Sequence, residues 1–323
     1  MAKTLSLDKK KSLVLKPKSL YNFDANFHKP SHFPLSDNFW EEGKYWITMI
    51  WEGQELGLKF ENKGTIEKPK IKMKIYSQRE LTKESIEKLI PELRWRFNFD
   101  QDISEFCERY KKDKILAPIL KKWRGMKPIA ANSLYEKLII YIVLQNATVR
   151  RSVQMLENLF EKFGKKVKFD NRTMSVFWGP KRMAESSEQE LRDLKLGYRA
   201  KFFIKITEQF VKGEIDEFKL RKMSKEEIKI EVLKLYGIGP ASVEYLLFED
   251  FYFCDALATI PLWEQKIMSK LLFNKDLVLT EKILRFFKKF KGWEKLAFHY
   301  IWEDIFWKRK HKHIEWLEKE IRL

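Results

Sequence analysis

The sequence predicts an α+β fold, with a small antiparallel β-containing N-terminal domain followed by an all-helical body. Two observations carry this prediction. Residues 44–76 alternate apolar and polar side chains, which is the period of half-buried strands. From about residue 80 the apolar residues recur at helical spacing instead. A chain of 323 residues is long enough for two such domains, and we predict that they comprise residues 1–80 and 81–323.

Three strand-like runs form the expected sheet, and they read KYWITMIW, ELGLKFEN and PKIKMKIYS. Glu52-Gly53-Gln54 and Asn62-Lys63-Gly64 separate these runs and are suited to tight turns. The preceding segment, FDANFHKPSHFP, contains prolines and histidines and no regular period. We expect that segment to be irregular.

The helical body begins with the segment SLYEKLIIYIVLQNATVRRSVQMLENLFEKFG, residues 133–164. Its apolar spacing predicts two helices, the first largely buried and the second amphipathic. In SEQELRDLK, Ser187 is the expected N-cap of another helix and Glu190 its capping-box partner. Further helical runs follow, and these are KIEVLKLY, GPASVEYLLFEDF, LWEQKIMSKLLF, EKILRFFKKF and WEKLAFHYIWEDIFWKRKHKHIEWLEKEI.

The composition favours a polyanionic partner. Lys and Arg outnumber Asp and Glu by 64 to 46, which gives a formal charge of +18. Each phosphate that a basic surface neutralises releases counterions, so such an excess favours nucleic acid. Charge alone is equally compatible with a generic basic surface.

Cysteine and histidine usage excludes several classes of site. Cys107 and Cys254 are the only cysteines, and the five histidines are dispersed. A disulfide framework, a cysteine zinc site and a four-cysteine iron–sulfur cluster are therefore excluded, and we expect no cofactor. No apolar run approaches the ~20 residues that span a bilayer, and the N-terminus lacks a signal-peptide core. We expect an intracellular protein without a membrane partner, in the cytoplasm or nucleoid, or in a eukaryotic nucleus.

The stretch LKLYGIGPASVEY, residues 233–245, interrupts two helices with a G-x-G turn. Glycine permits the positive φ of a tight turn, and Pro240 suits the first turn of the next helix. The free N–H groups at that helix start, aided by the helix dipole, suit one phosphate. A plain helical hairpin without a ligand explains the same residues.

Three further segments accompany the hairpin, and they read LYEKLIIYIVLQNATVRRS (134–152), LGYRAKFFIKITEQF (196–210) and GWEKLAFHYIW (292–302). Taken in their order along the chain, with the hairpin third, the four segments resemble the helix-hairpin-helix DNA glycosylase superfamily. The resemblance is strongest to its 3-methyladenine DNA glycosylase II and 8-oxoguanine glycosylase branch. The resemblance covers roughly residues 130–305, and the β-rich N-terminal part also fits this branch. It implies a helix-hairpin-helix at about residues 228–250.

The resemblance also implies how DNA is held. Backbone N–H groups at Gly237, Gly239, Ala241 and Ser242 would bind a phosphate, and a Na⁺ or K⁺ ion would bind hairpin carbonyls. In this superfamily the damaged base is turned out of the duplex, and we expect Gln145, Asn146 and Trp263 at that base or at the gap it leaves in the duplex. We expect Arg150 and Arg151 to contact phosphates. Trp263 is equally well explained as a core residue. The expected partner is double-stranded DNA with damaged bases, bound by a monomer.

Glycosylases extrude the damaged nucleotide, because the glycosidic bond cannot be reached inside the stack. The family places an Asp near C1′ about 20 residues after the hairpin, and here Pro261 occupies that position. Pro261 preserves a helix start but carries no charge. Glu264, about one turn into the helix, is the first candidate for the missing acid, and Asp255 is the second. An unidentified acid or a loss of catalysis also explains the proline.

The lysine that attacks C1′ in bifunctional members follows the G-x-G by two positions, where this chain has Ala241. The resemblance therefore favours a monofunctional DNA N-glycosylase that removes a damaged purine, oxidised or alkylated, in base excision repair. Lys266 could replace the missing lysine and would make the enzyme a bifunctional glycosylase/AP lyase. The third alternative is a catalytically inactive protein that binds DNA lesions.

Overall fold

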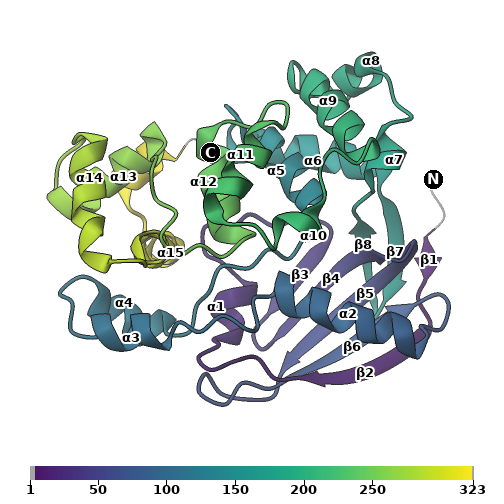
Figure 1. Cartoon of the computed structure of the whole chain (residues 1–323), viewed down its shortest axis with the longest axis horizontal. Helices are drawn as coiled ribbons and strands as arrows, with labels where there is room; N and C mark the ends of the chain where they lie inside the picture. Colours follow the sequence, from purple (N-terminus) through teal and green to yellow (C-terminus); the bar gives the residue numbers. More distant parts are fainter. Residues whose placement is uncertain (1–3, 322–323) are drawn as a thin grey trace.

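The computed structural model describes residues 4–321 and contains a twisted five-stranded antiparallel sheet near the N-terminus (Figure 1). Its strands are β2 (Lys9–Leu15), β3 (Asn38–Glu41), β4 (Lys44–Trp51), β5 (Gln54–Asn62) and β6 (Ile71–Ser77), in the spatial order β2-β6-β5-β4-β3. The register pairs Tyr45 with Phe60 and Phe60 with Met73. The three strands predicted from the alternating runs are thus present, and β2 and β3 were not predicted.

One face of this sheet is covered by α2 (Lys83–Arg96) and by the short helix α1 (Phe23–Phe27), which lies inside the segment predicted to be irregular. Leu89 and Leu93 of α2 pack against sheet residues such as Leu58, and all three are almost fully buried. The N-terminal unit therefore extends into α2, past the predicted boundary at residue 80.

A second sheet of three strands contains β1 (Leu5–Ser6), β7 (Lys165–Phe169) and β8 (Arg172–Val176), in the order β1-β7-β8. Gly57 of β5 allows the ring of Phe169 in β7 to pack directly against the backbone of the five-stranded sheet, because a Cβ at position 57 would lie 2.6 Å from that ring. Asp170, in the β7–β8 turn, accepts hydrogen bonds of 2.8 Å from Trp46 Nε1 and Tyr76 Oη. The α+β fold class is confirmed. The body also contains the antiparallel pair β7–β8, which was not predicted from the sequence.

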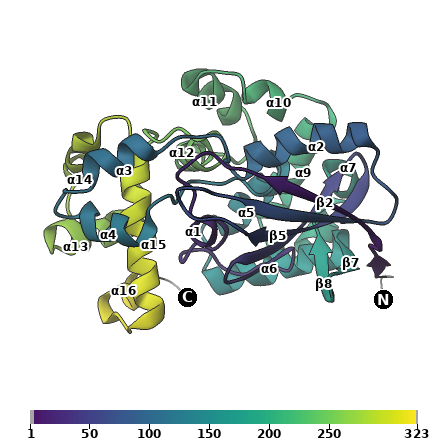
Figure 2. The ribbon, with the colours of Figure 1, turned by 90° about the horizontal axis from the view of Figure 1, so that it is seen from below.

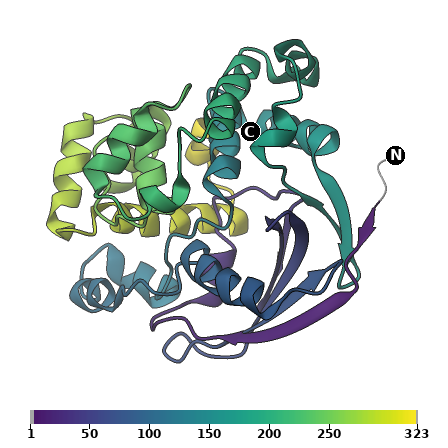
Figure 3. The same ribbon diagram turned by 45° about the vertical axis from the view of Figure 1, so that its right-hand side comes forward.

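The rest of the body consists mainly of helices (Figure 3). Their side chains form two hydrophobic cores. The first core is built by α5 (Leu134–Leu144), α6 (Val149–Phe163), α7 (Pro180–Met183), α8 (Glu188–Leu191), α9 (Arg199–Val211), α10 (Glu217–Leu220), α11 (Lys225–Leu233) and α12 (Pro240–Glu249). The second is built by α3 (Ser104–Tyr110), α4 (Leu116–Trp123), α13 (Leu262–Phe273), α14 (Thr280–Phe287), α15 (Glu294–His311) and α16 (Glu315–Glu320). Figure 2 shows α16 at the far end of the long helix α15.

Local sequence signals explain where several helices begin. Ser187 and Glu190 form the predicted capping box of α8. Ser133 with Glu136 caps α5 in the same way. As predicted, α5 is largely buried, and α6 buries one apolar face. Within residues 4–321, no helix combines the length and apolar character that crossing a membrane requires.

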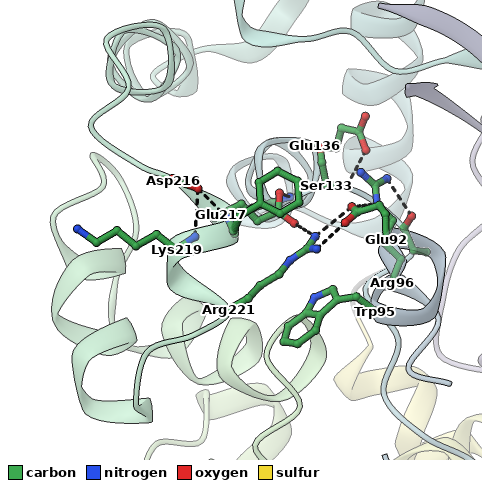
Figure 4. A network of polar contacts seen from close by, with 12 residues as sticks. Glu92, Trp95, Arg96, Ser133, Glu136, Asp216, Glu217, Lys219 and Arg221 are labelled. Atoms are coloured by element: carbon green, nitrogen blue, oxygen red, sulfur yellow. Dashed lines mark hydrogen bonds and ion pairs between the residues drawn. The ribbon is translucent and has the colours of Figure 1, made fainter. Parts of the chain in front are cut away.

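A buried polar network joins the N-terminal unit to the helical body (Figure 4). The Arg221 guanidinium of α10 binds both carboxylate oxygens of Glu92 in α2, at 2.5 and 3.0 Å, and also contacts Glu217. Arg96 Nε donates to Glu92 Oε1 at 2.7 Å. Burial opposes the charge of Glu92, but Arg221 and Arg96 outweigh it and lower the pKa of this carboxyl. The network fixes how α2 and α10 lie against each other.

We expect Arg221→Met to lower the free energy of unfolding by about 3 kcal/mol, because it removes one of the two arginines that balance the buried Glu92 carboxylate and leaves one oxygen of Glu92 without its charged donor. The matched control is Arg109→Met. Arg109 pairs with Glu105, and their side chains are 48% and 61% exposed, so its loss should cost about 1 kcal/mol or less. Urea unfolding of both variants measures the difference. Equal destabilisation would contradict a structural role for the network.

Candidate nucleic-acid interface and adjoining cavity

The predicted hairpin is formed by α11, the turn at residues 234–239 and α12. Gly237 has φ +82°, and a Cβ there would lie 2.7 Å from the Phe202 ring, so only glycine fits this position. Gly239, the N-cap of α12, has φ −105° and open space where a Cβ would lie. The second glycine therefore leaves the start of α12 uncovered and is not required by the backbone.

The start of α12 presents free backbone donors. Within residues 4–321, the N–H groups of Gly239, Ala241 and Ser242 have no hydrogen-bond acceptor, and the first intrahelical bond runs from Val243 N to Gly239 O. No acidic residue lies in the first turn. These donors point out of the positive end of the helix dipole and form a site for an anion.

The loop between α5 and α6 lies directly beside the hairpin. Gln145 Nε2 donates to the Gly237 carbonyl at 2.7 Å. Asn146 has φ +49° and contacts the Tyr198 hydroxyl at 3.4 Å. The Arg199 guanidinium holds the same loop through the carbonyl oxygens of Ile142, at 3.1 Å, and Gln145. The structure thus brings Gln145 and Asn146 to the hairpin, although they are about 90 residues away from it in sequence.

Two arginines follow this loop at the start of α6. Arg150 and Arg151 are exposed. Arg151 donates to the carbonyl oxygen of Lys195 at 2.5 Å, whereas Arg150 makes no ion pair with any residue of the described chain. Both side chains are therefore on the surface at the start of α6.

A small cavity of about 40 Å³ lies on the side of α12, where the N-terminal unit meets the helical body. Its walls come from the loop before β3 (Ser31, His32), from α12 (Tyr245, Phe248, Glu249), from α13 (Glu264) and from α15 (Lys295, Phe298, His299, Trp302, Glu303). This volume holds a few water molecules. It is well below the ~300 Å³ or more of typical ligand pockets, so a larger ligand must widen it.

Glu264 is the acid that the structure places in this cavity. Its Oε1 accepts a hydrogen bond from the Tyr245 hydroxyl, and its buried Oε2 has no partner. Burial raises the pKa of Glu264, although Lys295 and the Tyr245 hydroxyl oppose the shift. Burial therefore shifts the Glu264 carboxyl towards its neutral form.

The other ionisable groups of the cavity were not found by sequence reasoning. Glu249 accepts hydrogen bonds of 3.1 Å from Lys137 and Tyr141. Burial opposes its charge, yet the nearby Lys137 lowers the pKa of Glu249. Burial lowers the pKa of His299 well below its usual value, and its Nε2 has no partner. Clusters of buried, perturbed ionisable groups are typical of functional sites.

A sequence signal for these groups existed. Lys295, His299 and Glu303 recur every four residues in α15 and are all buried. Residues four apart lie on one face of a helix, so this spacing indicates a polar stripe along the buried part of α15. Such a stripe contradicts the pattern of a packing helix and points to a site.

Comparison with known proteins agrees with this geometry. No family model matches the chain. It is 26% identical over 228 residues to a Bacillus subtilis protein named DNA-3-methyladenine glycosylase, an alignment that covers 69% of this chain and 73% of the relative. The 3-methyladenine DNA glycosylase of Archaeoglobus fulgidus superposes with a TM-score of 0.70 at 15% identity, over 94% of this chain and 99% of that one. The 8-oxoguanine glycosylase/lyase of Clostridium acetobutylicum, solved with double-stranded DNA containing cytosine opposite 8-oxoG, gives 0.67 at 18% identity, over 95% and 98%.

The chain has the helix-hairpin-helix DNA glycosylase fold. The resemblance predicted from four sequence segments is confirmed. A helix does begin at Pro261, as predicted, because Pro261 is the N-cap of α13. Trp263, in the first turn of α13, is 44% exposed, and its ring meets the edge of Trp302 at 5.0 Å between centroids. It therefore lies beside the cavity with part of its surface free.

The two remaining candidates lie outside the cavity. The Asp255 carboxylate pairs with Lys225 of α11, and their side chains are 39% and 27% exposed. Lys266 pairs with Glu320 of α16 at 3.1 Å. Residues two apart leave opposite sides of a helix, so Lys266 does not share the face of Glu264. The structure brings Glu264 and Trp263 together at the cavity and keeps Asp255 and Lys266 in other contacts.

Gly239→Asp is expected to weaken binding to damaged and undamaged duplex DNA about tenfold, because it places an anion at the free amides of α12. The open space and negative φ at this position accept the side chain without strain. Gly239→Asn is the matched neutral control and should bind nearly as well as the parent protein.

Fluorescence anisotropy with labelled duplexes measures both variants, and affinity of the parent should fall roughly tenfold or more from 50 to 200 mM salt. Equal affinities of the Asp and Asn variants would remove the hairpin from the interface.

Proposed function

We propose that the protein is a monomeric DNA N-glycosylase of base excision repair, which removes a damaged purine, oxidised or alkylated, from double-stranded DNA inside the cell. One observation carries the proposal. The helix α12 presents free amides at its first turn and, one turn later, forms the wall of a cavity with Tyr245 and Glu249. The rise of ~1.5 Å per residue puts these two features within about 6–12 Å of each other, which is the reach of a single nucleotide. The names of its relatives and structural neighbours support the same activity.

In this proposal the hairpin holds one phosphate and reads no base. Backbone N–H groups of Gly237, Gly239, Ala241 and Ser242 bind the phosphate, and Arg150 and Arg151 bind further phosphates. Phosphate contacts position a protein without selecting sequence. A damage-scanning enzyme needs this property, because lesions occur in every sequence context.

The extruded base enters the cavity beside α12, and Gln145 and Asn146 occupy the gap that it leaves in the duplex. The cavity of about 40 Å³ must widen to admit a base. Trp263, partly exposed at its rim, stacks on the extruded base, a contact that contributes ~1–3 kcal/mol. Glu264 is the acid that acts in this cavity, and Asp255 remains the less suited candidate because it pairs with Lys225.

A Na⁺ or K⁺ ion at the hairpin is part of the proposal. The turn offers carbonyl oxygens at Leu233 and Ile238 that accept no hydrogen bond within residues 4–321. Rings of backbone carbonyls suit monovalent cations. Such an ion would stiffen the turn that presents the phosphate-binding amides.

Strand cleavage is the alternative activity, and one observation favours a specific lysine for it. Lys266 is held by Glu320, but Lys295 lines the cavity and is only 5% exposed. A desolvated lysine beside the sugar is a competent Schiff-base nucleophile. We nevertheless propose a monofunctional enzyme, because Lys295 Nζ lies over the rings of Tyr245 and Phe298, at 4.7 Å from each centroid, and these contacts hold its side chain in place.

The test is a panel of duplexes that each carry one lesion, incubated with the protein and analysed with and without alkali. We expect breaks only after alkali, because base release without lyase action leaves an intact abasic strand. Tight binding to a lesion without any break after alkali would show the catalytically inactive alternative instead.

Borohydride should trap no covalent complex on any processed lesion. A trapped complex would show that the enzyme is bifunctional. Its loss in Lys295→Ala or in Lys266→Ala would then identify the nucleophile.

A further inference from the structure

Within residues 4–321, Glu264 is the cavity carboxyl that has a fully buried oxygen without a hydrogen-bond partner. Its side chain is 3% exposed, its Oε1 is bound by the Tyr245 hydroxyl, and its Oε2 is buried without a partner. Glu249 accepts hydrogen bonds from Lys137 and Tyr141 through its Oε2, and both oxygens of Glu303 are bound, by the amide and hydroxyl of Ser31 at 3.0 and 2.6 Å. A buried polar atom without a partner is costly, so Glu264 Oε2 is poised to bind a group that enters the cavity.

The charges around Glu264 favour its neutral form. Facing it are Tyr245 and Glu249 from α12, Lys295, His299 and Glu303 from α15, and His32 from the loop before β3. Burial lowers the pKa of His32 to about 4 and that of His299 well below its usual value, so neither supplies a positive charge near neutral pH. Lys295 is the one cation among them, and burial together with Glu249 outweighs it and raises the pKa of Glu264. Bound DNA adds negative charge and acts in the same direction.

When the Glu264 carboxyl is neutral, the chemistry open to it is restricted. It cannot stabilise a developing sugar cation as a fixed anion would, and Pro261 supplies no charge at the family position. It can donate a hydrogen bond or a proton. If the extruded base occupies the cavity, the Glu264 carboxyl lies next to the base and not next to the sugar.

We propose that Glu264 acts on the base, giving its proton to a ring nitrogen of an uncharged purine lesion as the glycosidic bond breaks. This inference rests on the proposed glycosylase function. The bonding pair of C1′–N9 moves onto the purine, whose charge the transferred proton neutralises. Water bonds to C1′ and gives up a proton that restores the Glu264 carboxyl, so one water is consumed per base released. The base leaves uncharged.

The proposal names a substrate class. Uncharged damaged purines such as 8-oxoguanine or hypoxanthine are poor leaving groups and need the proton. Purines methylated at N3 or N7 already carry a positive charge and leave without it. Glu264 is therefore a catalytic residue for the uncharged class only.

The experiment measures single-turnover base release from two duplexes, one with an uncharged lesion and one with 7-methylguanine. Glu264→Gln keeps the size of the side chain but cannot transfer a proton. We expect it to slow release of the uncharged base by about 10²-fold or more and release of 7-methylguanine by less than about threefold. The matched control is Glu281→Gln on α14, an exposed carboxylate, which should leave both rates within about twofold.

The pH profile separates proton donation from a structural role. Release of the uncharged base by the parent protein should fall as pH rises through the pKa of Glu264, and release of 7-methylguanine should not. Tyr245→Phe removes the hydrogen bond that favours the charged form, so it should move this fall to higher pH. Thermal unfolding of each variant verifies the fold.

Equal slowing of both lesions by Glu264→Gln would overturn the proposal and make Glu264 the anion at the sugar. Unchanged rates for both would overturn it as well, and so would a parent protein that releases 7-methylguanine alone. These results leave the glycosylase function intact. A parent protein that releases neither base, nor any other base of the panel, contradicts the glycosylase function itself.

Discussion

The burial of α12 between two hydrophobic cores is the constraint on which the rest of the structure depends. Leu246 and Leu247 pack into the core built around α5, α6 and α9, whereas the adjacent Phe248 packs into the core around α13 and α15. Neighbouring residues on a helix leave it in different directions, so α12 cannot turn without opening one core. At its start, the contact of Gly237 with Phe202 and the hydrogen bond from Gln145 fix the turn as well. The free amides and the cavity wall are thus held in one rigid element.

The cavity exists because three parts of the chain meet beside this helix. The loop before β3 belongs to the N-terminal unit, and Ser31 binds Glu303 of α15 across 272 residues of sequence. The Glu92–Arg221 network joins the same two units at another point. Because the Ser31–Glu303 and Glu92–Arg221 contacts are polar and largely buried, they fix one relative position of the two units. Widening the cavity for a base therefore costs free energy, because it strains these contacts. Selectivity for damage can arise at this step, since a weakly stacked or weakly paired base costs less to extrude.

The sequence predicted the elements whose signals are local. The G-x-G hairpin, the capping box at Ser187 and the helix start at Pro261 depend on residues a few positions apart, and the structure contains all three. The strands β7 and β8 were not predicted, because each is only five residues long and shows too little of the alternating period to be distinguished from a loop. The raised pKa of Glu264 could not be predicted, because burial causes it and the residues that line the cavity around Glu264 come from α12, α15 and the loop at residue 31. Lys266 looked suitable by its distance in sequence, but helical geometry directs it to Glu320.

The central claim is that the damaged base leaves the duplex and enters the cavity beside α12 while the hairpin holds a phosphate. A crystal structure of Glu264→Gln bound to a duplex with a lesion that the parent protein processes tests this claim most directly. The account predicts the extruded base in contact with Tyr245 and His299, and a phosphate within hydrogen-bond distance of the Ala241 and Ser242 amides. A base still stacked in the duplex, or extruded to a site away from α12, would contradict it.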